Sequence, residues 1–130
     1  MEIISTDEAP KAIGPYSQAL VSNDFIFLSG QTPIDPVTGK LVEGSFGDMV
    51  HRVFRNLKAV LTRADCGFED VVRVSVYLTD LSNFGAMNAI YAEYFGDHKP
   101  ARSTIGVAEL PLGAPVEIDM IARRERQATG

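Results

Sequence analysis

The stretch from Val71 to Thr79, VVRVSVYLT, carries the clearest strand pattern in the 130-residue chain. Because successive side chains of a strand point to opposite faces, alternate positions are predicted to form one apolar face, made of Val72, Val74, Val76 and Leu78. Val71 adds an apolar residue to the other face, which is typical of a strand covered on both sides. The pattern therefore predicts a central strand, on which the neighbouring elements must pack.

Two helices are predicted, one on each side of this strand in the sequence. Apolar residues recur at helical spacing from about residue 46 to about residue 65. Ser45 is a favourable N-cap, and Asp48 three residues later supplies the acidic half of a capping box. A second helix is expected from near Ser82 to Gly96, since glycine commonly ends helices.

Four further strands complete the predicted sheet, at Tyr16–Ser22, Phe25–Ser29, Ala101–Val107 and Pro115–Ala122. Asn23-Asp24 forms a plausible tight turn between the first two, and the turn-rich Glu109–Ala114 is expected to join the last two as a hairpin. The order of strands, helix, strand, helix and strands predicts an α+β domain over residues 1–130. Both helices are expected on one face of a mixed sheet.

The sheet face away from the helices is predicted to be too apolar to meet water. Phe25–Leu28 carries apolar side chains on both faces, whereas a strand of a half-solvated antiparallel sheet alternates more cleanly. An oligomer contact is the first explanation for this pattern. The alternative is that the irregular stretch Gln31–Ser45 folds over part of that face.

Composition excludes several classes of protein. With 45% apolar and 22% charged residues, the chain is typical of a globular domain and not of a disordered protein. No apolar run is long enough to span a bilayer, and the acidic N-terminus is unlike a signal peptide. A single cysteine, Cys66, excludes an intramolecular disulfide and favours a cytoplasmic setting. The net charge of -5 argues against a nucleic-acid partner.

No metal or cofactor is expected from the motifs. His51 and His98 have no partner at ligand spacing, and both are predicted to lie exposed on the surface. The chain has no phosphate-binding glycine loop and no nucleophile elbow. The densest basic cluster, at Arg123, Arg124 and Arg126, falls in a C-terminal tail that is expected to fray.

The last two strands carry the residues best suited to catalysis or ligand binding. If their apolar positions face the helices, the polar ones share the opposite face, and these are Arg102, Thr104, Glu117 and Asp119. An arginine in a partly dry site offers a planar fork of donors suited to a carboxylate or phosphate. A nearby glutamate can act as a base on a bound water. The alternative is a cross-strand salt bridge without chemistry, which the pattern alone favours.

Several motifs in order along the chain resemble those of the RidA (YjgF) family. They are Ile13–Ala19 (IGPYSQA), Ser29–Gln31 (SGQ), the helix pattern Phe84…Asn88…Tyr91, Pro100–Thr104 (PARST), Glu109–Pro111 (ELP) and Val116–Ile118 (VEI). The resemblance implies a chorismate-mutase-like fold, assembled as a homotrimer whose sheets form an inner barrel. It also implies ligand sites between subunits, at which 2-imino acids and their enamine tautomers are hydrolysed to 2-keto acids and ammonia.

This resemblance assigns expected roles to individual residues. Arg102 would grip the substrate carboxylate, and Glu117 would take a proton from the attacking water. The expected substrate-binding residues are Tyr16, Ser29, Gly30, Asn88, Arg102 and Thr104. For Tyr16 and Asn88 a structural role is about as plausible as contact with substrate. Some family members carry cysteine where this chain has Thr104, so the preferred substrate can differ from theirs.

Two alternatives to an imine hydrolase stay open at the level of sequence. One is a non-catalytic protein that binds small carboxylates and regulates a metabolic enzyme. The other is an RNA-directed ribonuclease or translation inhibitor, against which the net charge argues. The expected partners are thus a small 2-imino or 2-keto acid and two further copies of the chain, without nucleic acid or membrane.

Overall fold

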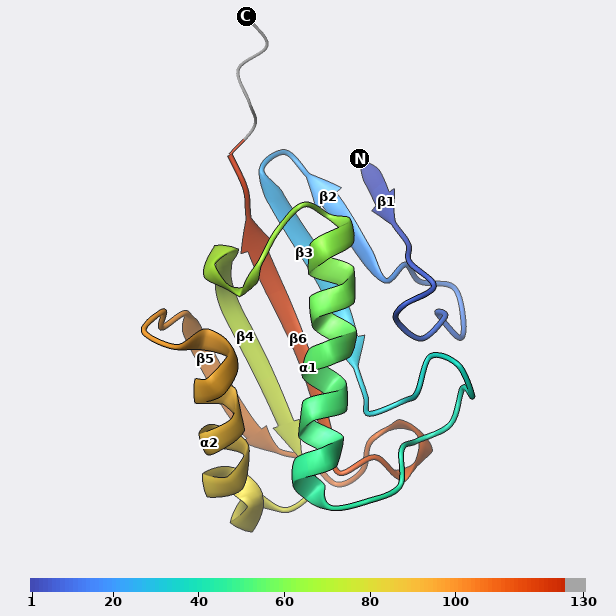
Figure 1. Ribbon diagram of the computed structural model, residues 1–130, viewed down its shortest axis with the longest axis vertical. Helices are drawn as coiled ribbons and strands as arrows, with labels where there is room; N and C mark the ends of the chain where they lie inside the picture. Colours follow the sequence, from blue (N-terminus) through green and yellow to red (C-terminus); the bar gives the residue numbers. More distant parts are fainter. Residues whose placement is uncertain (126–130) are drawn as a thin grey trace, which may run out of the picture.

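A mixed six-stranded sheet carries two α-helices on one of its faces in the computed structural model, which describes residues 1–125 (Figure 1). The strands are β1 (Glu2–Ile4), β2 (Ala19–Ser22), β3 (Phe25–Gln31), β4 (Val71–Leu78), β5 (Ala101–Gly106) and β6 (Val116–Arg123). The helices are α1 (Phe46–Arg63) and α2 (Phe84–Phe95). The predicted α+β class, with both helices on one side of a mixed sheet, is confirmed.

The strand order β1-β2-β3-β6-β4-β5 places β4 between β5 and β6. β4 runs antiparallel to β6 and parallel to β5. The predicted hairpin between the last two strands is therefore wrong. The physical reason is the helix between β4 and β5, because two parallel neighbours need a crossover connection and α2 supplies it.

Helix α1 supplies most of the helical side of the core. Its buried stripe follows the predicted spacing and consists of Val50, Val53, Phe54, Leu57, Val60 and Leu61. The predicted capping box is confirmed, since the Ser45 hydroxyl accepts from the Asp48 backbone N–H at 3.1 Å and the Asp48 carboxylate accepts from the Ser45 N–H at 3.0 Å. Hydrogen bonding of the Asp48 carboxylate to the Ser45 backbone N–H, and then to the Ser45 side chain, lowers the pKa of Asp48.

The start of β4 departs from the predicted alternation. Val71 is fully buried, whereas Val72 is 41% exposed. The pairing with β6 shifts between Val71 and Arg73, which marks a bulge. Because a bulge inserts an extra residue, Val71 takes the place on the core face that was predicted for Val72. From Val74 onward the predicted apolar face is as expected.

The sheet face opposite the helices stays open. Phe27 on β3 is 46% exposed and Ile105 on β5 is 48% exposed. The stretch Gln31–Ser45 does not cover them, because it is tied to α1. Asn56 of that helix donates to the carbonyls of Thr32 at 3.3 Å and Ile34 at 2.9 Å. The alternative that this loop covers the apolar side chains of the open face is therefore wrong for Phe27 and Ile105.

The C-terminal strand is anchored further than expected. β6 extends to Arg123, and the Arg124 guanidinium donates to the carbonyl of Ala64. Arg124 also lies 3.5 Å from a carboxylate oxygen of Glu2 and 3.6 Å from one of Asp65. The expected fraying is wrong for Arg123, which pairs with Phe25 of β3, and for Arg124, which two ion pairs and a carbonyl hold; Arg126 lies outside the described residues. In the described part of the chain, neither helix has the length and apolarity needed to cross a bilayer.

Asn56 provides a direct test of how the fold is held. The side chain is fully buried, and Asn56→Leu keeps its branched shape but removes the donor for two loop carbonyls. We expect a loss of about 1–3 kcal/mol in the free energy of unfolding, measured by urea denaturation. The exposed Lys58→Ala on the same helix is the control and should change stability by less than about 0.5 kcal/mol. An Asn56→Leu variant as stable as the control would contradict this account of the loop.

Candidate functional site

Arg102 lies on the edge strand β5 and points to the helical face of the sheet. Its register partner is Val74 of β4, which is fully buried under the helices. The guanidinium carbon lies 4.7 Å from the centre of the Tyr91 ring and 5.6 Å from that of the Phe84 ring, both on α2. Cation–π contacts with two rings hold the arginine in place without consuming its hydrogen-bonding fork.

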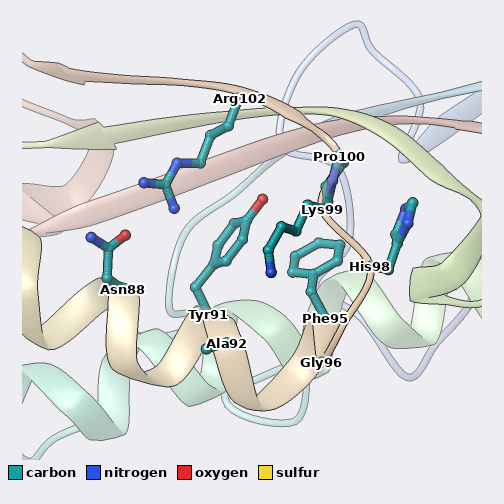
Figure 2. A pocket seen from close by; sticks show the side chains of 9 residues that line it. All are labelled: Asn88, Tyr91, Ala92, Phe95, Gly96, His98, Lys99, Pro100 and Arg102. Atoms are coloured by element: carbon teal, nitrogen blue, oxygen red, sulfur yellow. The ribbon is translucent and has the colours of Figure 1, made fainter.

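The surroundings of Arg102 are rich in unsatisfied polar atoms. Among residues 1–125 no carboxylate lies within ion-pair distance of its guanidinium. Three nearby buried oxygens, Asn88 Oδ1, the Tyr91 hydroxyl and Thr104 Oγ1, have no hydrogen-bond partner. Figure 2 shows Asn88 and Tyr91 extending from α2 toward Arg102. Buried polar groups are normally paired, so this cluster has the character of a binding site for a polar group from outside the protomer.

A cavity of about 350 Å³ opens beside these residues. Arg102, Asn88 and Tyr91 line one end of it, and the loop between α2 and β5 lines the other (Figure 2). Burial raises the pKa of the Tyr91 hydroxyl, and the positive charge of Arg102 opposes that effect. The cavity therefore presents a guanidinium without a carboxylate partner and a protonated phenol to an anionic ligand.

Glu117 lies on the opposite face of the sheet. It pairs in register with Tyr77 of β4, which in turn pairs with the exposed Ile105 of β5. Burial raises the pKa of the Glu117 carboxyl, and the nearby charge of Asp119 adds to the effect. A carboxylate whose pKa is moved toward neutrality is a stronger base than an ordinary surface glutamate.

The Glu117 carboxyl group belongs to a second cavity of about 460 Å³. The other residues that line it are Ile13, Tyr16, Ser29, Gly30, Thr32, Ile34, Pro111 and Leu112. The Ser29 hydroxyl donates to the carbonyl of Ser17 at 2.6 Å, and the Tyr16 hydroxyl accepts from the backbone N–H of Ile13 at 3.3 Å. Tyr16 therefore keeps its own proton available for a ligand, while Ser29 has already committed its proton.

Gly30 is required by the position of Glu117. A Cβ on Gly30 would lie 2.9 Å from the carboxyl carbon of Glu117, closer than such atoms approach one another. The glycine falls where the pairing of β3 with β6 is shifted between Leu28 and Gln31. The bulge and the missing side chain together let the Glu117 carboxyl group lie against the backbone of β3.

The structure thus divides the predicted site residues into two groups. Arg102, Asn88 and Thr104 gather on the helical face, and Tyr16, Ser29, Gly30 and Glu117 gather around the second cavity. The prediction that Arg102 and Thr104 share a face with Glu117 and Asp119 is wrong. The cause is the register with β4, which pairs Arg102 with Val74 and Thr104 with Val76, both on the core side. Asp119 accepts from the Tyr77 hydroxyl at 3.0 Å on the open face.

Sequence reasoning missed the aromatic support of Arg102. The sequence identifies Phe84, Asn88 and Tyr91 as a helix pattern of the family, but support of a cation by its rings was not predicted. The signal was present in the spacing, because positions four and seven residues after Phe84 fall on one side of a helix. By contrast, no pattern in the sequence marks Ile13 or Leu112 as lining the second cavity.

Both histidines are half-buried and have hydrogen-bond partners. His51 Nδ1 lies 2.8 Å from the Tyr94 hydroxyl, and its Nε2 lies 3.9 Å from a Glu93 oxygen. His98 Nε2 lies 2.6 Å from the carbonyl of Val71. The expectation of fully exposed histidines is wrong, because each ring is half-buried and hydrogen-bonded to a distant segment. Within residues 1–125 no three His, Cys, Asp or Glu side chains gather to hold a metal ion.

Comparisons with known proteins agree with the fold and the motifs. Residues 6–124 match the family model described as Endoribonuclease L-PSP. A RutC family protein of Pyrococcus horikoshii is 48% identical over 124 residues, or 95% of this chain and 98% of that protein. The chloroplastic Reactive Intermediate Deaminase A of Arabidopsis thaliana is 45% identical over 121 residues, or 93% of this chain and 65% of that protein. The structure of E. coli TdcF with bound serine aligns with a TM-score of 0.91 at 36% identity, covering 96% of this chain and all of the other. The chain therefore belongs to the Rid family, also called YjgF/RidA.

Proposed function

We propose that the protein hydrolyses 2-imino acids, such as 2-iminobutanoate and 2-iminopropanoate, to 2-keto acids and ammonia. The observation that carries this proposal is the guanidinium of Arg102, which has no carboxylate partner among the described residues and lies over two aromatic rings beside three unsatisfied polar atoms. A planar carboxylate is the group that fits such a fork. Every 2-imino acid carries one next to its imine carbon.

Arg102 fixes the substrate through two parallel N–H···O bonds to the carboxylate. The adjacent imine carbon is thereby held at a set distance from the protein, which removes much of the entropic part of the barrier. The buried oxygens of Asn88, Tyr91 and Thr104 surround the bound end of the substrate. They supply hydrogen-bonding partners that water would otherwise provide.

Glu117 activates the water. A protonated imine is already electrophilic at carbon, so the oxygen of water attacks this carbon while Glu117 takes a proton from the water. The new C–O bond and the displaced π electrons give a tetrahedral carbinolamine with a neutral amino group. Glu117 returns the proton to that nitrogen, and the C–N bond breaks with its electron pair leaving on ammonia. The Glu117 carboxylate then takes the hydroxyl proton as the C=O bond of the 2-keto acid forms, and passes it to the departing ammonia, which leaves as ammonium. The raised pKa of Glu117 suits a group that must both take and return a proton.

Arg102 and Glu117 point to opposite faces of one sheet, so we infer that a complete site needs two copies of the chain. The edge strand β5 of one copy brings its Arg102 to the Glu117 cavity of the next. The exposed apolar side chains of the open face, Phe25, Phe27 and Ile105 among them, favour burial between subunits. A homotrimer with the three sheets forming an inner barrel would both bring Arg102 to Glu117 of a neighbouring copy and bury the apolar open face.

The comparisons support this proposal over the alternatives. A relative of 45% identity is named a reactive intermediate deaminase, and a structural relative holds serine, a small molecule with a carboxylate. The family model carries the name of an endoribonuclease. RNA cleavage is not favoured here, because the net charge is -5 and His51 and His98 each have a partner in different parts of the fold. A non-catalytic carboxylate binder would need Arg102 but not Glu117.

The first prediction separates binding from turnover. Arg102→Ala should abolish both turnover and the binding of 2-ketobutanoate, and Arg102→Lys should still cost substantially, because it keeps the charge without the fork. Glu117→Gln should retain 2-ketobutanoate binding but lose turnover by about 10²–10⁴-fold. Threonine dehydratase supplies 2-iminobutanoate, semicarbazide traps the unhydrolysed imine, and calorimetry measures binding.

The matched control for these variants is Arg55→Ala, an exposed arginine on α1, which should leave both readouts unchanged. Hydrolysis by Glu117→Gln at the wild-type rate would show that another group activates the water. A wild-type protein that binds 2-ketobutanoate but never accelerates imine loss would place the chain among the non-catalytic binders.

The second prediction concerns assembly. Sedimentation equilibrium of the wild type at micromolar concentration should give three times the chain mass of 14.1 kDa. Phe27→Asp places a charge on the open face and should reduce that mass and the imine hydrolase activity together. Val37→Asp, at a position that is 91% exposed in the loop after β3, should change neither. A stable wild-type monomer would remove the basis for a shared site.

The third prediction follows from the raised pKa of Glu117. Its pKa is higher in the folded protein than in the unfolded chain, so this contribution to stability is complete below the unfolded pKa and is lost as pH rises through the folded pKa. Glu117→Gln removes that loss. The melting temperature of this variant relative to wild type should therefore be more favourable at about pH 7 than at about pH 4. If the difference in melting temperature between the variant and wild type is the same at both pH values, the burial of Glu117 does not affect stability.

A further inference from the structure

Leu112 adopts a backbone conformation that leucine rarely takes. Its φ is +59° and its ψ is +17°, in the left-handed region. Only two other non-glycine residues among those described have positive φ, and they are Asn23 and Asp65. Asparagine and aspartate tolerate this region because their short polar side chains bond locally, whereas a bulky apolar side chain meets steric strain. Strained residues of this kind cluster at functional sites.

The fold itself does not explain why a leucine stands there. The turn at Pro111–Gly113 is closed by backbone hydrogen bonds from Gly113 N–H to the Leu110 carbonyl and from Ala114 N–H to the Pro111 carbonyl, both 3.1 Å long. Glycine or asparagine at position 112 would form the same turn without strain. Nor does the side chain serve the core, because Leu112 is 62% exposed.

What the leucine does line is the cavity that contains Glu117. Ile13, which is 73% exposed, lies in the lining with it, and the buried Ile34 adds a third apolar side chain. Two large apolar side chains exposed around one carboxylate are costly unless something apolar covers them. No lysine, arginine or histidine lines this cavity among the described residues, so a second anionic group would meet only the repulsion of Glu117.

We propose that Leu112 is a specificity-determining residue, strained so that its side chain, with Ile13 and Ile34, contacts the hydrocarbon side chain of an aliphatic 2-imino acid. The inference rests on the proposed imine hydrolysis. The substrate's carboxylate lies toward Arg102 of a neighbouring copy, its imine carbon lies at Glu117, and its alkyl group packs on this apolar wall. Substrates with longer or branched alkyl groups gain contact, and substrates with acidic side chains are rejected.

The test compares wild type with Leu112→Gly and Leu112→Asn on three substrates. A D-amino acid oxidase generates the imines from D-alanine, D-2-aminobutyrate and D-leucine, and semicarbazide competes for them. Each methylene that loses its apolar contact is worth about fourfold when fully buried, so partial contact predicts a smaller change. Both variants should lower the ratio of kcat/KM for the leucine-derived over the alanine-derived imine by about three- to tenfold. The loss should come mainly from a higher KM for the larger substrate.

The melting temperature distinguishes a role in specificity from a purely structural role, which would lower the melting temperature of the variants. Because glycine and asparagine relieve the strain at position 112, both variants should melt no lower than wild type although they have lost selectivity. Asn23→Gly is the matched control, since it changes another residue of positive φ, in the turn between β2 and β3 and outside both cavities. It should leave the substrate ratio unchanged.

The outcomes separate this inference from the proposed function. If wild type hydrolyses the imines but the ratio is the same in Leu112→Gly, the inference is wrong and the function stands. If the variants melt well below wild type with an unchanged ratio, Leu112 serves the fold and the inference is also wrong. If no imine is hydrolysed, the proposed function fails. Calorimetry then measures the binding of the corresponding 2-keto acids and tests whether Leu112 determines specificity. If wild type prefers the larger keto acid and Leu112→Gly loses that preference, the role of Leu112 is supported. If both proteins show the same preference, the role of Leu112 is overturned.

Discussion

The parallel crossover from β4 through α2 to β5 determines where the chemistry of this protein can occur. Because β5 lies beside β4 in parallel register, Arg102 is paired with the buried Val74 and must point to the helical face. The same helix that makes the crossover then presents Phe84 and Tyr91 to the guanidinium. One connection thus places the arginine and also supplies the rings that hold it. Glu117, on the antiparallel strand β6, is left on the other face.

The separation of Arg102 and Glu117 on opposite faces is consistent with several features that one chain alone does not explain. The arginine has no carboxylate partner among the described residues, and three buried oxygens near it are unpaired. On the other face the chain keeps a glycine at position 30 so that Glu117 can lie against the backbone. The same face exposes Phe27 and Ile105. In the function proposed here each face carries half of a site, and the apolar surface on the Glu117 face is where another copy would bind, so catalysis and assembly depend on each other.

The features that the sequence predicts well are local ones. Ser45 and Asp48 are three residues apart, so their capping box forms within one helical turn and needs no tertiary information. The sheet face to which Arg102 points is not a local feature. The alternation of side chains along a strand predicts that Arg102 and Thr104 share a face, but it does not predict which face. Only the pairing with β4 decides that. The strand, helix, strand order from Val71 to Gly106 contained the answer, since a helix between two strands favours a parallel crossover.

Other features depend on contacts that no local pattern records. The bulge that buries Val71 in place of Val72 arises from pairing with β6, and the partners of His51 and His98 come from distant segments. The left-handed conformation of Leu112 cannot be predicted from a residue type that usually avoids it. The family motifs assigned chemistry to Arg102 and Glu117, but the structure of one chain was needed to see that they cannot meet within it.

The central claim is that one site is built from the Arg102 side of one copy and the Glu117 side of another. Co-expression of Arg102→Ala and Glu117→Gln chains tests it directly, because each variant is expected to be inactive when purified alone. In a mixed trimer, the intact Arg102 of one chain can face the intact Glu117 of its neighbour, and random assembly makes about a quarter of the sites whole. The account predicts imine hydrolysis at roughly that fraction of the wild-type rate. Mixed trimers as inactive as either parent would contradict it.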